Sequence, residues 1–283
     1  MTYLASNKTM KCDVANWPFI ILQQTLEEIY NSDGYNMISH GGATMRHCYT
    51  LFSGGFDSTL AILKVISGRN PIELIPVFFD YGQKSRLEEA GAVKRLVPTF
   101  RERSKHPDTV IRDCRVYSIE SLKSGLFSWS ESAILEGRSK HEDTDVENRN
   151  MILISCLASV IMADWKRSPT NEVTEIITGF TNGWYDTDLS FIRNLNKLFR
   201  DADKPIRITA PLIPRGQKDG MTPEQLANIA NSLDACSLLN EMSWSCYYPQ
   251  NGKPCGKCEP CKKRKNIFTE LGEKRIAKEA ELI

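Results

Sequence analysis

Long hydrophobic runs are missing from this sequence. The most apolar stretch, at 151–163, has thirteen residues, whereas a transmembrane helix needs about 20. The first seventeen residues contain no continuous apolar core behind their basic residues, so they do not have the pattern of a secretory signal. These absences predict a cytoplasmic protein that does not enter a membrane.

An excess of either charge is missing too. Lysine and arginine number 36 and aspartate and glutamate 35, which leaves a net charge of 36 − 35 = +1. No overall electrostatic attraction to nucleic acid is therefore expected. The 283 residues are 41% hydrophobic and 25% charged, a globular composition that excludes a disordered chain, a collagen-like fibre and a pure coiled coil. Their number suits one large domain, alone or with an appendage.

From residue 47 onward, apolar runs of strand length alternate with helical patterns. We expect strands at 47–53, 72–80, 109–119, 175–180 and 206–212, and helices at 58–66, 147–165, 189–199, 222–235 and after 261. The helix at 147–165 is apolar nearly all round, which places it centrally. This alternation predicts an open, mainly parallel α/β sheet that binds ligands at the carboxyl ends of its strands.

The chain is predicted to have three parts. A polar extension covers 1–46, with a short helix at 19–30 and a loop at 31–43, the main domain covers 47–240, and a cysteine-rich module covers 241–283.

A glycine-rich loop separates the first strand from the first helix. Its sequence, Ser53-Gly54-Gly55-Phe56-Asp57-Ser58-Thr59, places backbone N–H groups at a helix N-terminus, where they can bind phosphate. It lacks the lysine of a Walker A loop, which reaches the β- and γ-phosphates. A loop without that lysine suits a nucleotide that is cleaved to release pyrophosphate. The structural alternative is a plain turn in which Ser58 caps the helix.

Histidine is scarce, whereas cysteine occurs nine times. Four cysteines, Cys246, Cys255, Cys258 and Cys261, lie within sixteen residues and supply a tetrahedral ligand set for Zn²⁺. This zinc would be structural, since four protein ligands leave no open coordination position. An iron–sulfur cluster is the closest alternative. The basic run at 262–265 that follows indicates either a nucleic-acid contact or a solvated helix start, and we favour the second.

Several of these segments together resemble one protein family. The SGGxDS loop matches the PP-loop motif of the N-type ATP pyrophosphatases. FFDYGQKSRLEEA at 78–90, VENRN at 146–150 and the cysteine segment are similar to the 7-cyano-7-deazaguanine synthases within that class. The motifs occur in family order across about residues 47–268. The resemblance implies a fold of the adenine nucleotide alpha hydrolase-like type, ATP as co-substrate, and Mg²⁺.

The resemblance also implies site residues. Catalytic roles would belong to Asp57, Ser58, Arg149 and Lys218. ATP would contact Leu51, Phe52, Ser53, Gly54, Gly55, Phe56, Asp57, Ser58, Thr59, Leu60, Asp80, Tyr81, Gly82 and Gln83. The substrate would contact Arg149, Asn150, Gly179 and Asp186. The structural alternatives are a turn at 80–83, a salt bridge that tethers the helix end for Arg149, and a solvated surface position for Lys218.

The chain departs from the family in the loop at 179–188. Only Asp186 keeps its place there, whereas Thr187 and Asp188 replace a cysteine and an arginine. Ser85 also stands where a histidine is common, and Glu147 replaces a proline. The loop lies beside the substrate in this reading, so its changes leave the identity of the substrate or acceptor open.

Three functions follow, in order of preference. The first is an ATP-dependent ligase that adenylates the carboxylate of 7-carboxy-7-deazaguanine and converts it with ammonia to 7-cyano-7-deazaguanine, as in queuosine biosynthesis. The second is an antiphage-defence relative that joins a deazaguanine acid to the N-terminus or a lysine of a partner protein. The third is a tRNA-binding zinc protein with a vestigial nucleotide site. Nucleic acid is the least favoured partner, and a homodimer is left open.

Overall fold

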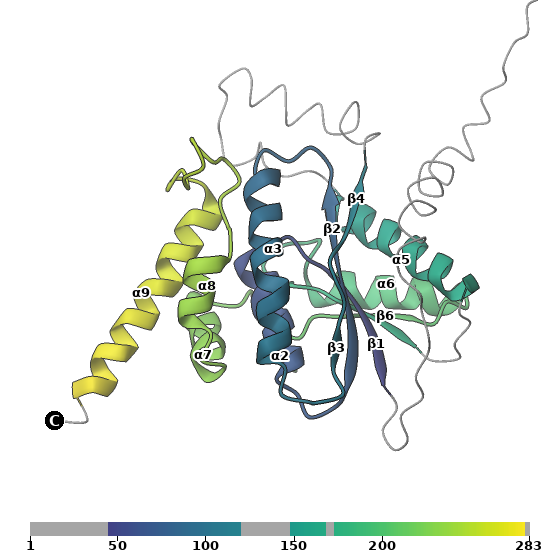
Figure 1. Cartoon of the computed structure of the whole chain (residues 1–283), viewed down its shortest axis with the longest axis horizontal. Coiled ribbons are helices and arrows are strands. Elements are labelled where there is room, and N and C mark those ends of the chain that lie inside the picture. Colours follow the sequence, from purple (N-terminus) through teal and green to yellow (C-terminus); the bar gives the residue numbers. More distant parts are fainter. Residues whose placement is uncertain (1–44, 120–147, 168–172, 281–283) are drawn as a thin grey trace, which may run out of the picture. The chain divides into compact units, whose positions relative to one another are not determined.

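Parallel strands form the centre of the fold, and helices lie on both faces (Figure 1). The computed structural model describes residues 45–119, 148–167 and 173–280. The helix predicted at 19–30, the loop at 31–43 and nearly all of the predicted extension 1–46 lie outside the described residues. The predicted boundary between the main domain and the cysteine-rich module stays a proposal.

Six strands make up one sheet in the order β3-β2-β1-β5-β6, with β4 also paired to β2. Every pairing is parallel, so the predicted α/β class is confirmed. Four of these strands are β1 (Arg46–Leu51), β2 (Ile72–Asp80), β5 (Thr174–Ile177) and β6 (Ile206–Thr209). All nine residues of β2 match the prediction, because a nearly continuous apolar run marks a strand that is buried on both faces.

The single strand predicted at 109–119 is two short strands, β3 (Val110–Ile111) and β4 (Arg115–Ser118). Both pair with β2, but β3 stops opposite Leu74 and β4 starts opposite Val77. Pro76 lies between these two paired segments of β2. Backbone groups of alternate residues in β2 point to the same side, and the Leu74 carbonyl points toward β3 and β4. The backbone nitrogen of Pro76 therefore points toward β3 and β4 as well. Proline has no N–H to donate, so the pairing is interrupted where that donor is missing.

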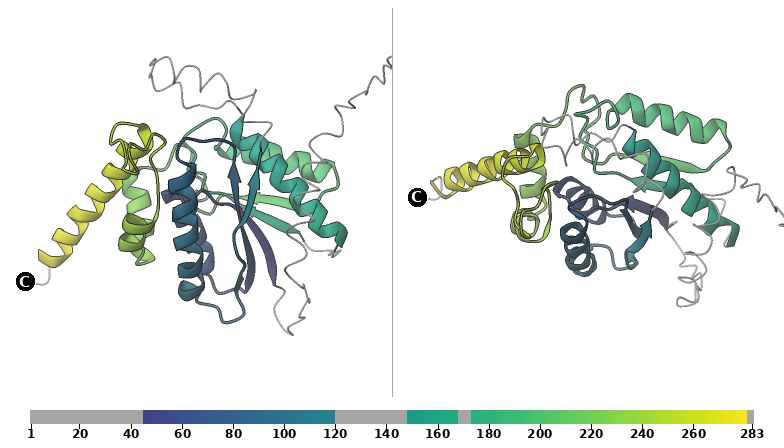
Figure 2. Two further views of the ribbon diagram at one scale, coloured as in Figure 1. Left: turned by 45° about the horizontal axis from the view of Figure 1, so that its top comes forward. Right: turned by 90° about the horizontal axis from the view of Figure 1, so that it is seen from above.

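Right-handed crossovers place the helices on opposite faces of the sheet. The chain passes from β1 outward to β2 and β3 through α2 (Phe56–Ile66) and α3 (Arg86–Arg103). It then returns beside β1 and moves outward the other way through α5 (Arg149–Arg167) and α6 (Leu189–Asp201). Figure 2 shows α2 and α3 on one side of the sheet and α5 and α6 on the other.

The prediction that the helix at 147–165 is buried nearly all round is wrong for the residues that the structure describes. One face of α5 packs inward through Ile154, Leu157 and Ile161, whereas Met151 exposes 41% of its surface. Apolar residues occur around most of this helix, but the helix lies over one face of the sheet. Only the side of the helix that faces the sheet is therefore buried by it.

Three further helices pack outside α2 and α3 (Figure 1): α7 (Pro223–Ser232), α8 (Cys236–Met242) and α9 (Glu259–Ala280). The predicted capping box of α7 is confirmed. Thr222 Oγ1 accepts from Gln225 N–H at 3.2 Å, and Thr222 N–H donates to Gln225 Oε1 at 2.9 Å. Leu226, Leu239 and Ile267 of these helices share one buried apolar cluster with α2, so the outer layer is anchored by hydrophobic burial.

The strand order locates the ligand crevice. β1 lies between β2 and β5, and the connections after β1 and β5 leave toward opposite faces of the sheet. Where neighbouring parallel strands diverge in this way, a crevice opens at their carboxyl ends. The glycine-rich loop after β1 and the 179–188 loop after β5 therefore face each other.

Candidate nucleotide site and metal centre

The loop after β1 is held tightly against α3. Gly54 has a φ of +71°, and a Cβ there would lie 2.8 Å from Ala92 Cβ and 3.0 Å from the Glu89 carbonyl oxygen. Only glycine meets both demands without strain. Gly55, not Ser58, is the N-cap of α2, and it makes no side-chain capping bond. The structural alternative of Ser58 as cap is therefore wrong, and the first turn of α2 has no side-chain cap.

The opposite wall of the crevice touches this loop directly. A Cβ added at Gly179 would lie 2.6 Å from Ser58 N and 2.8 Å from Ser58 Cα. Gly179, predicted to contact substrate, thus packs its backbone on the first turn of α2. Asn182 holds the same loop in place, since its Nδ2 donates to the carbonyl oxygens of Lys218 at 3.0 Å and Asp219 at 2.8 Å.

Lys218 contributes to this contact through its backbone, and its side chain is exposed. Among the residues that the structure describes, no side-chain contact of Lys218 supports its predicted catalytic role, which stays a prediction.

Asp57 lies in the first turn of α2, beside Gly179 of the loop after β5. Its Oδ2 accepts from Lys263 Nζ at 2.7 Å, and the same ammonium lies 3.4 Å from Thr181 Oγ1. Among the residues that the structure describes, Asp57 Oδ1 and Thr59 Oγ1 are buried with no hydrogen-bond partner. Buried polar atoms are nearly always satisfied, so these two orphans fit a ligand or a metal ion at the start of α2.

The segment at 80–83 forms a turn at the end of β2. Gly82 has a φ of +85° and donates its N–H to Asp80 Oδ1 at 2.9 Å, while Tyr81 N–H donates to Gln83 Oε1 at 3.0 Å. The alternative interpretation of 80–83 as a turn is thus confirmed. The contact of these residues with ATP stays a prediction.

A buried polar group connects that turn to α3. Gln83 Nε2 and Ser85 Oγ donate to the two carboxylate oxygens of Glu89 at 3.0 and 2.7 Å. Burial nevertheless raises the pKa of Glu89, because it outweighs the two hydrogen bonds that favour the charged form.

Three of the predicted substrate residues come together at the start of α5. Arg149 hydrogen-bonds to the hydroxyls of Tyr81 and Tyr247, and Asn150 Nδ2 donates to buried Asp186 Oδ2 at 2.8 Å. The nearby Tyr81 hydroxyl raises the pKa of Arg149, against burial, which lowers it. Burial also raises the pKa of Tyr81 to about 12. The cluster therefore contains a fixed cation, Arg149, and a buried carboxyl group, Asp186. A guanidinium is a group that binds anionic ligands.

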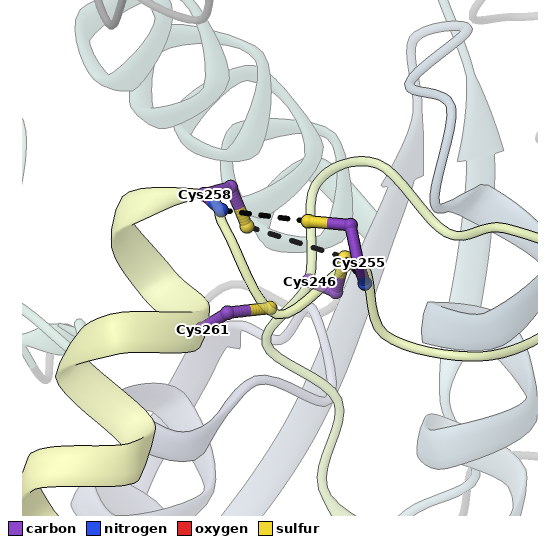
Figure 3. Close-up of side chains that lie close together, drawn as sticks. All are labelled: Cys246, Cys255, Cys258 and Cys261. Atoms are coloured by element: carbon purple, nitrogen blue, oxygen red, sulfur yellow. Dashed lines mark hydrogen bonds between the residues drawn. The ribbon is translucent and has the colours of Figure 1, made fainter.

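The four cysteines converge as predicted (Figure 3). The Sγ atoms of Cys246, Cys255, Cys258 and Cys261 all lie within 4.8 Å of one another. A tetrahedral ion with metal–sulfur bonds of about 2.3 Å requires sulfur separations of roughly 3.8 Å, so the group could hold one ion. A multi-iron cluster would hold its cysteines further apart.

Backbone N–H groups surround these sulfurs. Cys255 N–H and Tyr248 N–H point at Cys246 Sγ at 3.2 and 3.3 Å, and Gly256 turns the chain with a φ of +71°. Burial opposes ionisation of Cys255, but N–H groups of Lys257 and Cys258 lower the pKa of this thiol to about 7. Such donors stabilise thiolates, the form that binds metal.

The cysteine segment is also tied to the nucleotide loop. Trp244 N–H donates to the Gly54 carbonyl at 2.8 Å. Arg264 donates to Ser243 Oγ and to the Leu239 carbonyl, each at 2.8 Å. The interpretation of 262–265 as a solvated helix start is therefore wrong for Lys263 and Arg264, whereas Lys262 and Lys265 are exposed. Neither Lys263 nor Tyr247 was predicted at the site, and no local pattern in the sequence indicates them.

The parallel sheet, the loop after β1 and the crevice beside β5 define an α/β protein of the PP-loop type. A model of the protein family described as "Queuosine biosynthesis protein QueC" matches residues 47–272. The chain belongs to this family.

Relatives named 7-cyano-7-deazaguanine synthase are similar over most of the chain. That of Leptospira interrogans is 26% identical over 255 residues, which cover 84% of this chain and 92% of the relative. That of Pyrococcus horikoshii is 27% identical over 250 residues, 81% of this chain and 95% of the relative. The solved structure of NMN synthetase from Francisella tularensis has 10% identity and a TM-score of 0.36, covering 92% of this chain and 93% of that one.

The antiphage-defence alternative finds no support in these relatives, whose names describe synthases. Within the described ranges, no helix is both long and apolar enough to cross a membrane.

Proposed function

We propose that this protein is an ATP-dependent ligase that converts 7-carboxy-7-deazaguanine and ammonia to 7-cyano-7-deazaguanine. The observation that carries the proposal is the family match over 47–272, because this range contains the PP-loop, the Arg149 cluster and all four cysteines. The names of the relatives support the choice of substrate.

The chemistry requires two activations. A carboxylate oxygen of the substrate attacks the α-phosphorus of ATP, the bond to the β-phosphate breaks, and pyrophosphate leaves. Ammonia then attacks the acyl carbon, loses a proton and displaces AMP to give an amide. A second ATP adenylates the amide oxygen, and loss of AMP with the two N–H protons forms the nitrile.

The protein positions the reactants and neutralises charge. The N–H groups at the start of α2 and the hydroxyls of Ser53 and Ser58 bind the phosphates that depart as pyrophosphate. Asp57 Oδ1, buried and without a partner among the described residues, is suited to hold Mg²⁺, which offsets the phosphate charge when bound. Arg149 is the cation for the substrate carboxylate, and its two tyrosine partners fix its orientation.

The four-cysteine group is proposed to hold one structural Zn²⁺. All ligand positions would be filled by sulfur, so the ion would take no part in the reaction. Its effect would be to order a segment that has few apolar residues of its own.

The test is product identification. The purified protein is incubated with ATP, Mg²⁺, 7-carboxy-7-deazaguanine and ammonium, and the deazaguanine product is identified by mass spectrometry beside AMP and pyrophosphate. A nitrile product is expected. Formation of AMP without amide or nitrile would contradict the proposed acceptor.

Asp57→Asn is expected to lower turnover at least a hundredfold, since one lost electrostatic contact at a reacting centre commonly costs about 10²-fold. The matched control is Asp203→Asn, which makes the same chemical change at an exposed residue with a φ of +52°. Asparagine tolerates that conformation, so its turnover should match the wild type. Normal turnover in Asp57→Asn would remove the PP-loop from the mechanism.

A further inference from the structure

The nucleotide loop has no lysine of its own, yet an ammonium group lies in it. Lys263 comes from the first turns of α9, 206 positions along the chain from Asp57. Its Nζ contacts Asp57 Oδ2 at 2.7 Å and Thr181 Oγ1 at 3.4 Å. It therefore links the start of α2 to the loop after β5.

The charges at this point require a cation when phosphate binds. The Asp57 carboxylate lies in the first turn of α2, where phosphate is expected, and would repel it if left alone. Lys263 offsets that charge. An ammonium has three N–H donors, and among the described residues only Asp57 and Thr181 accept from this one. A third donor is available to an anion.

Lys263 is also held in place more firmly than a surface lysine. Its side chain is 30% exposed, and it follows Cys261, one of the four converging cysteines, by two residues. The neighbouring Arg264 stacks 5.1 Å from the centre of the Phe268 ring and donates to the Leu239 carbonyl at 2.8 Å. These contacts fix the start of α9 beside the crevice.

We propose that Lys263 is the phosphate-binding cation of this site, taking the β- and γ-phosphates of ATP and the pyrophosphate product. The four-cysteine group holds it there through the start of α9. This inference rests on the proposed function, because it needs a nucleotide in the crevice.

The experiment measures binding of inorganic pyrophosphate in the presence of Mg²⁺ by calorimetry, with full-length protein and no turnover. Lys263→Met should weaken binding about tenfold or more, because it removes a charge-assisted contact. Lys263→Arg, which keeps the charge, should recover most of the affinity. Lys265→Met is the matched control, since it removes the same charge from an exposed neighbour in the same basic run, and it should bind as the wild type does.

Unfolding and metal content, measured for each variant, separate binding from folding. Unchanged pyrophosphate affinity in Lys263→Met would overturn the inference while leaving the proposed function intact. Tighter binding would also overturn it, because the ion pair would then be a block that Mg²⁺ must displace. If the wild type bound no pyrophosphate, both the inference and the proposed function would fail. Should Lys263→Met fold poorly, Lys263→Arg against Lys263→Gln gives the same comparison.

Discussion

At the scale of single residues, the site depends on two glycines, Gly54 and Gly179, which have no side chain. Gly54 lets the loop after β1 pack against α3, and Gly179 lets the loop after β5 pack against the start of α2. A Cβ at either position would meet atoms within 2.8 Å, so neither wall of the crevice could close as it does. Glycine at these two positions therefore allows the close packing that shapes the crevice.

Gly179→Ala is the sharpest test of this point. The new Cβ would press on Ser58 N and Cα, which are backbone atoms that cannot rotate away. We expect stability to fall by roughly 1–3 kcal/mol, the usual cost of overpacking, and pyrophosphate binding to weaken as the start of α2 shifts. Urea unfolding and calorimetry measure the two effects.

Gly183→Ala is the control, from the same loop. Nothing lies within 4 Å of its added Cβ, so both stability and pyrophosphate affinity should be close to those of the wild type. Equal behaviour of the two variants would show that the contact with Ser58 does not constrain the site.

At the scale of elements, α9 connects the four-cysteine group with the candidate nucleotide site. Its start carries Cys261 of the four-cysteine group and Lys263 of the nucleotide site, and further along it buries Ile267 in the core cluster. A substitution at one of the cysteines should therefore also weaken pyrophosphate binding at the loop after β1.

Cys258→Ser is expected to lose the proposed metal and to destabilise the protein by about 4 kcal/mol or more, since metal loss is among the few mechanisms with effects of that size. It should also weaken pyrophosphate binding, because the start of α9 is no longer fixed. Metal analysis, urea unfolding and calorimetry give the three readouts. Cys156→Ser, at a partly buried cysteine of α5 outside the group, should retain the metal. A metal-free Cys258→Ser protein of normal stability and pyrophosphate affinity would refute the coupling.

At the scale of the whole molecule, one buried carboxyl shapes how stability depends on pH. Burial raises the pKa of Glu89 above its ordinary value of 4.5, so the folded protein holds a proton that the unfolded chain has released. The contribution of Glu89 to the free energy of unfolding therefore falls as the pH rises above about 4.5, until the raised pKa is passed.

Glu89→Gln should remove the part of the fall in unfolding free energy that comes from ionisation of Glu89. Glutamine keeps an oxygen for Gln83 and can donate to Ser85 Oγ, yet it carries no charge. Urea unfolding from pH 4.5 to 8 should show the stability of the wild type falling relative to this variant. Glu102→Gln, an exposed change on the same helix, should run parallel to the wild type. A gap that stays constant with pH would contradict the raised pKa.

Much of the fold could be predicted because its signals are local. Strand β2 and the cap at Thr222 were predicted residue by residue, since an apolar run and a capping box each depend on neighbours in sequence. Helix α3 was not predicted; Pro98 and many charged residues obscure its buried face. The break between β3 and β4 was missed because it depends on the neighbouring strand, where Pro76 lacks a donor.

The candidate site divides along the same line. The glycine-rich turn at Ser53–Thr59 and the convergence of the four cysteines could be predicted from the sequence alone, because each motif brings its groups together within a few residues of chain. Only the tertiary structure decided that Lys263 meets Asp57, that Tyr247 meets Arg149 and that Gly179 lies on Ser58. Contacts of this kind join segments that are far apart in the chain, and they are set by how strands and helices pack, which no local spacing records.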